Sequence, residues 1–411
     1  MMKKIILSLT LFIACTCFSQ KYTYDENFPL EDYNFVLGTN SLGSKYQFTN
    51  DSKIIEQAKQ TRALGSNILK ISITERNLPD YGYKPKDVSE MMEVLDLIPD
   101  YEEVMNMDFK YYFFWFHTAT KIKWKRGIDR QQEKILYQEM YDFIEFLLTE
   151  HNNSGKTFFI GNWEGDWLLH PQMNKNSIPS PDDVANMTKW LQIRQKAVDD
   201  AKENIAHENV EVYFYVEVNL VNKGLEGKTC LTRDVLPNVN PDFVSYSSYE
   251  SSKKVDYETN KKFLVRAVNY IEEQLQPKEG LPFERRVLIG EYGGHAFEDI
   301  PGTFLRQFSN VKDIMQLTLE MDLPFALHWQ LYNNEYRKKD GASKNMSLIN
   351  EEGEKMPVFF LHQNYYKAMN AFLKDYKEEH GSYPEHEVFK EEALLVLNKV
   401  YDELIEKYFN S

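Results

Sequence analysis

Short apolar runs alternate with longer amphipathic stretches along most of the chain. The runs are rich in β-branched and aromatic residues, and they are almost continuously apolar instead of alternating strictly with polar residues. Strands of a parallel sheet have this composition when helices cover both of its faces. Eight such runs lie at residues 34–40, 67–74, 111–117, 157–163, 210–216, 243–248, 286–291 and 325–331.

The stretches between the runs carry ordinary helix signals. Ser52 is a suitable N-cap for a helix that ends at Leu64, and Gly65 follows as a C-terminal stop. Residues 131–149 and 181–206 have apolar residues at three- and four-residue spacing. Further helices are predicted at residues 258–275, 303–321 and 358–375.

Eight strand–helix units in this order predict an α/β fold, a single (β/α)8 TIM barrel. A doubly wound open sheet is the alternative, but it does not need eight units, and no glycine-rich phosphate turn follows the first strand. We expect the catalytic barrel to occupy residues 20–378. Residues 379–411 hold one more amphipathic stretch, at 387–409, which is predicted to be a C-terminal helical extension packed on the barrel.

The first residues carry the features of a targeting segment. Two lysines precede an apolar stretch, residues 5–14, which is too short to span a bilayer. This pattern predicts a signal peptide over residues 1–19. A lipid anchor at Cys15 is the alternative, because residues 12–15 are similar to a degenerate lipobox. Both routes predict a protein outside the cytoplasm, secreted or periplasmic or a cell-surface lipoprotein, and no later segment is apolar enough for a membrane span.

Charge and cysteine content narrow the possible partners. The chain has 63 acidic and 48 basic residues, a formal net charge of −15, which argues against nucleic acids and anionic membrane surfaces as partners. Cys230 is the only cysteine beyond the predicted signal peptide, so no intramolecular disulfide is expected. Stability must therefore come from a hydrophobic core.

Aromatic and polar residues gather where the predicted strands end. In a barrel of this kind the active site lies at the C-terminal ends of the strands. Aromatic rings can stack on the apolar faces of sugar rings, while polar groups between them bind the hydroxyls. The sequence therefore predicts a carbohydrate as the partner. The predicted substrate-binding residues are Trp115, His117, Asn162, Trp163, Trp167, Tyr246, Tyr249, Tyr292 and Trp329.

Two glutamates at strand ends could cleave a glycosidic bond, a reaction that needs two carboxyl groups facing each other across the bond. Glu164 follows the fourth strand and Glu291 ends the seventh, and these strands lie nearly opposite each other in an eight-stranded barrel. Glu217 also ends a strand and is a rival for Glu164, although it lies only one step further round. The sequence predicts Glu164 and Glu291 as the catalytic pair.

The setting of these glutamates resembles glycoside hydrolase clan A. Residues 290–293 (GEYG), at the end of an apolar strand, are similar to the context of the clan's nucleophile, and the clan's acid/base glutamate follows strand 4. Trp329 matches the clan's sugar-platform tryptophan. Tyr246 or Tyr249 matches the tyrosine that hydrogen-bonds the nucleophile.

The sequence also departs from the clan's pattern. The clan usually has an asparagine directly before the acid/base glutamate, but here that position is Trp163, and Asn162 stands one residue further back. The arginine often found near the end of strand 2 has only imperfect counterparts, Lys70 and Arg76. These differences concern the contacts around the sugar at the cleaved bond.

The resemblance implies a retaining glycoside hydrolase that works by double displacement, with Glu291 as the nucleophile, Glu164 as the acid/base and no cofactor. No metal site is expected either, because no HxH or HExxH spacing accompanies His117 and His328. Two other functions stay open at this point: a non-catalytic glycan-binding barrel, and a transglycosylase on the same scaffold.

Overall fold

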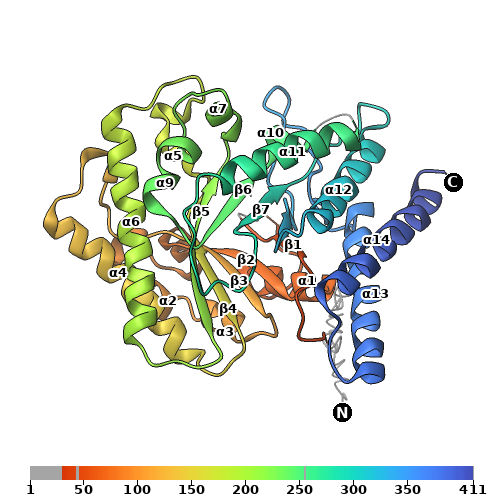
Figure 1. The fold of residues 1–411 in the computed structure, drawn as a ribbon, viewed down its shortest axis with the longest axis horizontal. Coiled ribbons are helices and arrows are strands. Elements are labelled where there is room, and N and C mark those ends of the chain that lie inside the picture. Colours follow the sequence, from red (N-terminus) through yellow and green to blue (C-terminus); the bar gives the residue numbers. More distant parts are fainter. Residues whose placement is uncertain (1–29, 43–45, 254–255, 411) are drawn as a thin grey trace, which may run out of the picture.

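Eight parallel strands close into a barrel in chain order in the computed structural model, which describes residues 30–42, 46–253 and 256–410 (Figure 1). Each strand pairs with the next, and β8 pairs with β1. This confirms the predicted TIM barrel, while the predicted signal peptide and Cys15 lie outside the described residues. The strands are β1 (Leu37–Asn40), β2 (Ile68–Ile73), β3 (Tyr111–Phe116), β4 (Thr157–Gly161), β5 (Glu211–Val218), β6 (Phe243–Ser247), β7 (Val287–Tyr292) and β8 (Ala326–His328).

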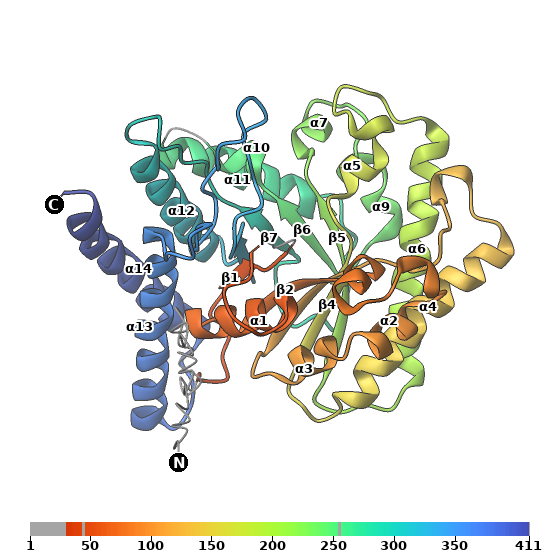
Figure 2. The ribbon, with the colours of Figure 1, turned by 180° about the vertical axis from the view of Figure 1, so that it is seen from behind.

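Helices surround the barrel and follow the strands along the chain (Figures 1 and 2). The long ones are α1 (Lys53–Leu64), α4 (Arg130–Glu150), α6 (Pro181–Asn204), α11 (Tyr257–Glu272), α12 (Thr303–Glu320), α13 (Pro357–His380) and α14 (His386–Tyr408). The short ones are α2 (Met91–Leu97), α3 (Asp100–Asn106), α5 (Gly165–Leu169), α7 (Val221–Leu225), α8 (Leu231–Asp234), α9 (Leu236–Val239) and α10 (Tyr249–Ser252). Within the described ranges, the 3-10 helices are η1 (Glu75–Tyr81), η2 (Pro85–Asp87), η3 (Trp124–Arg126) and η4 (Pro171–Met173).

Local sequence signals set the helix boundaries. Ser52 accepts a hydrogen bond from Ile55 N at 3.3 Å, and Gly65 ends α1 in the left-handed conformation, with a φ of 101°. The sequence did not place a helix between residues 76 and 105, where the structure has α2 and α3. These helices have seven residues each, too few for the apolar repeat to be recognised.

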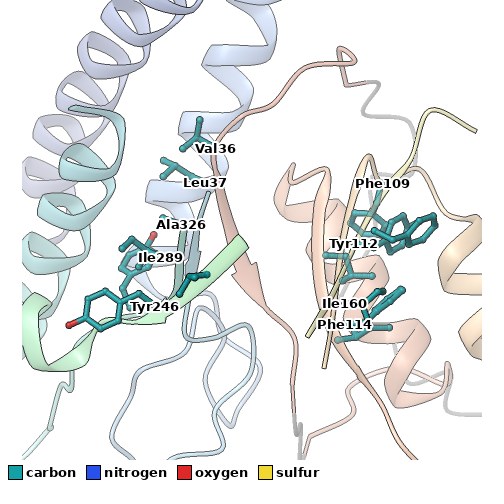
Figure 3. Close-up of a cluster of buried hydrophobic side chains, with 14 of the residues drawn as sticks. Val36, Leu37, Phe109, Tyr112, Phe114, Ile160, Tyr246, Ile289 and Ala326 are labelled. Carbon is teal, nitrogen blue, oxygen red and sulfur yellow. The ribbon is translucent and has the colours of Figure 1, made fainter. Parts of the chain in front are cut away.

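Strand residues divide between two apolar layers, because successive side chains of a strand point to opposite faces. Outward residues pack under the helices, and Figure 3 shows part of this layer, including Leu37, Tyr112, Ile160 and Ile289. Inward residues fill the barrel with aromatic rings, among them Phe113 and Phe159, which stack with centroids 4.4 Å apart. The lower barrel is therefore a packed core, and a site can exist only at its mouth.

The C-terminal helix packs beside α13 at one flank of the barrel, as both ribbon views show (Figures 1 and 2). Its buried residues, such as Leu397, face the helix layer. The Tyr401 ring stacks on Phe308 of α12 with centroids 5.3 Å apart. This agrees with the predicted helical extension.

Leu397→Ala is expected to lower the free energy of unfolding by about 2–5 kcal/mol, because it leaves a cavity between α14 and the helix layer. Leu395→Ala is the matched control, since that leucine lies on the same helix but is 66% exposed; its effect should stay within about 0.5 kcal/mol. Urea unfolding measures both. Equal effects would contradict the packing described for α14.

Candidate active site

A β-bulge in β7 turns Glu291 into the barrel. Tyr246 pairs with Ile289, but Ser247 pairs with Glu291, so β7 has one extra residue at this point. Gly290 also faces inward, since a Cβ there would lie 1.7 Å from Ser245 Oγ, a contact that only glycine avoids. The bulge therefore brings two successive residues to the lumen, and the second is the candidate nucleophile.

Glu164 lies on the turn from β4 into α5. Its main-chain N–H donates to Glu217 Oε1 at 3.1 Å, which ties the turn to the end of β5. Gly165 lets the turn approach closely, because a Cβ there would lie 2.4 Å from Leu231 Cδ1. Glu164 is half-buried, whereas Glu291 is only 3% exposed.

One hydroxyl lies between the two carboxylates. Ser247 Oγ is 2.5 Å from Glu164 Oε1 and 3.4 Å from Glu291 Oε2. Taken together, these lengths limit the distance between the two oxygens to about 6 Å, which admits the spacing of roughly 5–5.5 Å that a retaining pair requires. The structure thus brings together the two glutamates that the sequence singled out.

Burial keeps a proton on this pair. Desolvation, followed by the charge of Glu217, raises the pKa of Glu164 to about 7, against the hydrogen bonds from Ser247 and Trp167. Desolvation, followed by the charge of Glu164, raises the pKa of Glu291. Two carboxylates this close do not ionise together easily, so the pair holds one proton near neutral pH.

Two aromatic residues predicted for the site hydrogen-bond the carboxylates themselves. Tyr249 in α10 hydrogen-bonds Glu291, so it takes the position that Tyr246 and Tyr249 shared in the sequence. Trp167 in α5 hydrogen-bonds Glu164.

The tryptophans form the walls of the site. Trp115 of β3 and Trp329, directly after β8, lie side by side with ring centroids 6.1 Å apart. A cavity of about 1050 Å³ extends from there between η1, η3 and α6. Its lining includes four of the six tryptophans and two further predicted residues: Trp115, Trp124, Trp163, Trp190, His117 and Asn162.

Two predicted residues do not reach the site. Tyr246 lies in the layer between barrel and helices (Figure 3), where its hydroxyl is 2.8 Å from Ser251 Oγ. Tyr292 is fully buried on the same side, with its hydroxyl 3.3 Å from His362 Nε2. Each tyrosine follows an inward-facing residue and so points outward, away from the two carboxylates.

Asn162 does not replace the missing asparagine in an obvious way. Its Nδ2 donates to the Trp163 carbonyl at 2.9 Å, and its buried Oδ1 has no protein partner among the described residues. Trp115 Nε1 is buried in the same way. Such atoms are suited to bind a hydroxyl of a ligand.

Sequence reasoning missed Ser247 and gave Lys70 no clear role. Two features of the sequence could have indicated them. Serines at positions 245 and 247 alternate with outward residues in β6, and a lysine interrupts the apolar strand β2, where an unpaired charge would be costly to bury. Asp166 holds the loop after β5, because its carboxylate accepts from the main-chain N–H groups of Asn219 and Leu220, at 2.9 and 3.0 Å.

A compact group of possible metal ligands among the described residues lies far from the barrel mouth, at the start of α14. It consists of the exposed Asp322, His386 and Glu387. Lys390 Nζ already lies 2.9 Å from Asp322 and 3.0 Å from Glu387, so its ammonium group already balances the negative charge of these carboxylates.

No helix within the described ranges has the length and apolar character needed to cross a membrane.

Comparison with known proteins shows the fold. No protein-family model and no curated protein sequence matches the chain. A GH5_18 protein from Bifidobacterium longum subsp. infantis superposes with a TM-score of 0.54 and 12% identity, over 80% of this chain and 78% of that one. A GH5_18 variant from Streptomyces cattleya, solved in complex with Manβ1-4GlcNAc, gives 0.52 and 11%, over 85% and 82%.

A β-glucuronidase from Bacteroides uniformis gives a TM-score of 0.49 and 11% identity over 82% of this chain, which spans only 35% of that enzyme's length. The structural neighbours are thus TIM-barrel glycoside hydrolases of clan A. At these identities the likeness shows a shared barrel fold.

Glu164→Gln is expected to stabilise the protein more at pH 8 than at pH 5. The pKa of Glu164 rises from an ordinary 4.5 to about 7 in the folded state, so the native protein loses relative stability as pH rises between these values. Glutamine has no charge to desolvate and escapes this loss. Differential scanning calorimetry at both pH values measures the difference in Tm between variant and wild type. The same difference at both would contradict the raised pKa.

Proposed function

We propose that the protein is a retaining glycoside hydrolase of clan A, with Glu291 as the nucleophile and Glu164 as the acid/base. The observation that carries this proposal is the Ser247 hydroxyl between the two carboxylates, which keeps one oxygen of each within about 6 Å of the other and so admits the spacing of a retaining pair. The barrel shared with the GH5_18 proteins supports it at the level of the fold.

The geometry suggests how each step proceeds. Ionised Glu291 attacks the anomeric carbon while protonated Glu164 donates its proton to the leaving oxygen. Lys70 and Tyr249 both favour the ionised form of Glu291. The departing group takes the proton of Glu164, which then serves as the base that activates water against the glycosyl-enzyme. This reaction starts with one proton on the two carboxyl groups, and that is the state that the pair holds near neutral pH.

The walls of the site favour a poly- or oligosaccharide as substrate. Trp115, Trp124 and Trp163 line one cavity, which reaches Trp163 directly before Glu164, and flat indole rings suit the C–H faces of successive sugars. A neighbour with the same fold binds the disaccharide Manβ1-4GlcNAc. The net charge of −15 favours a neutral or weakly charged glycan.

The proposed place of action is outside the cytoplasm, on the basis of the lysines and apolar stretch at the N-terminus. Cell fractionation of the full chain, with and without residues 1–19, tests this. Equal retention of both forms in the cytoplasm would contradict it.

Glu291→Gln and Glu164→Gln are each expected to lower kcat on a natural glycan by at least about 100-fold, since each removes a group needed in the transition state. Glu250→Gln is the matched control: that carboxylate accepts from Asn222 N at 2.8 Å and lies outside the proposed machinery. Reducing-end release from a polysaccharide panel measures activity. Wild-type turnover in either of the first two variants would overturn the pairing.

Azide distinguishes the two roles. With an activated aryl glycoside, Glu291→Ala should form a glycosyl azide of inverted configuration, because azide makes the only displacement. Glu164→Ala should form one of retained configuration, because azide displaces Glu291 from the glycosyl-enzyme. NMR of the products decides, and the opposite stereochemistry would exchange the two assignments. If the wild type releases no product and the variants bind glycans as tightly as the wild type does, the protein is a glycan-binding protein instead.

Trp124→Ala is expected to raise KM for a long oligosaccharide by about 3- to 10-fold, the loss of one stacking contact. Trp124 lines the cavity from η3, in the segment after β3, and stacks on Trp190 with centroids 5.8 Å apart. KM for a short aryl glycoside, which does not extend that far, is the internal control. An equal rise for both substrates would show that the change is structural.

A further inference from the structure

A fully buried ion pair lies beneath the two carboxylates. Lys70 Nζ of β2 is 2.9 Å from Glu217 Oε2 of β5, and both side chains are 0% exposed. The inward positions below them carry aromatic rings, such as Phe113 and Tyr215, so the barrel is closed by packing. A buried ion pair is a weak source of stability, because desolvation of its charges offsets their attraction. Because stability does not explain this ion pair, its position beneath Glu164 and Glu291 indicates a role in the site.

The pair contacts the main chain of both catalytic segments. Glu217 Oε1 accepts from the N–H of Glu164 at 3.1 Å. Lys70 Nζ donates to the carbonyl of Gly290, the residue before Glu291, at 3.2 Å. Ser245 Oγ of β6 donates to Glu217 Oε2 at 2.8 Å and fixes its orientation. One ion pair thus connects the end of β4 to the bulge of β7 across the lumen.

The two charges of the pair act on the carboxylates in opposite directions. The charge of Glu217 raises the pKa of Glu164 and of Glu291, and that of Lys70 lowers both. With both present, the two effects on each pKa act against each other. The other charged or titratable groups that face the two carboxylates or act on them are Tyr215 below, Tyr249 beside Glu291, and Lys253 and Glu335 at the mouth.

We propose that Lys70 and Glu217 are positioning residues that hold the main chains of Glu164 and Glu291 at their working separation and balance the charge beneath them. Glu217, considered from the sequence as a rival catalytic acid, has its oxygens engaged by Lys70, Ser245 and the N–H of Glu164. It cannot serve a leaving group as well. This inference rests on the proposed function.

The test is a charge cycle with four variants: Lys70→Met, Glu217→Gln, the double variant, and the conservative Lys70→Arg. The pH dependence of kcat/KM on an aryl glycoside is measured for each, and its basic limb reports loss of the proton from the acid/base group. Kinetic parameters at the optimum separate kcat from KM. Glu164→Gln and Glu291→Gln, measured on the same substrate, show separately whether the proposed function holds.

The two single charge-removing variants are expected to shift the basic limb of the pH profile in opposite directions. Glu217→Gln leaves the charge of Lys70 unbalanced and should move the basic limb to lower pH by about one unit, and Lys70→Met should move it to higher pH by a similar amount. The double variant should return the limb to the wild-type position, with kcat lowered at least about 10-fold and KM little changed, because the carboxylates lose their alignment. Lys70→Arg keeps the charge and should leave the limb in place.

Shifts in the same direction, or an unmoved limb in active single variants, would overturn the inference and show a purely structural ion pair. If a single variant does not fold, the double variant decides alone: wild-type kcat overturns the inference, and a lowered kcat with an unmoved limb supports it. Activity that persists in Glu164→Gln and Glu291→Gln would overturn the proposed function instead.

Discussion

The interior of an eight-stranded barrel has room for side chains and little else, so every strand must divide its residues between that interior and the surrounding helices. Everything else in the structure depends on this division. In β5 it sends Tyr213, Tyr215 and Glu217 inward, and the valines at 212, 216 and 218 outward. A shift of one residue in the register would replace Glu217 with valine and remove the partner of Lys70.

The site forms where this alternation is interrupted. The bulge at Gly290 and Glu291 adds one residue to β7, and without it Glu291 would point to the helices as Ile289 does. The extra inward residue had to be glycine, because Ser245 Oγ occupies the space of a Cβ. Bulges commonly turn side chains toward active sites, and here the bulge sets the direction of the proposed nucleophile.

Electrostatics links the site to the core below it. Glu217, Glu291 and Lys70 are buried and the half-buried Glu164 lies beside them, so their charges act strongly on one another. Lys70 and Glu217 act on the remaining two carboxyls in opposite directions. Those two carboxyls hold a proton between them, because burial raises the pKa of both and the charge of Glu217 adds to each shift. The same state, with one proton on the pair, is the state from which a double displacement starts. The aromatic rings that fill the lower barrel and the charged residues above them therefore form one continuous arrangement.

The sequence was enough to predict the eight strands, the long helices and the opposition of Glu164 and Glu291, because these depend on local periodicity and on chain order around a barrel. The direction in which each residue at the mouth points depends on contacts between elements that are distant in the sequence. The bulge in β7 depends on the pairing of β6 with β7, and the Lys70–Glu217 pair joins residues 147 positions apart. Tyr249 rather than Tyr246 reaches Glu291, and Trp124 and Trp190 join one cavity, through packing that no local pattern records. A local sequence pattern shows the periodicity of one helix or strand, whereas the partners of a buried charged residue depend on all the strands that surround it.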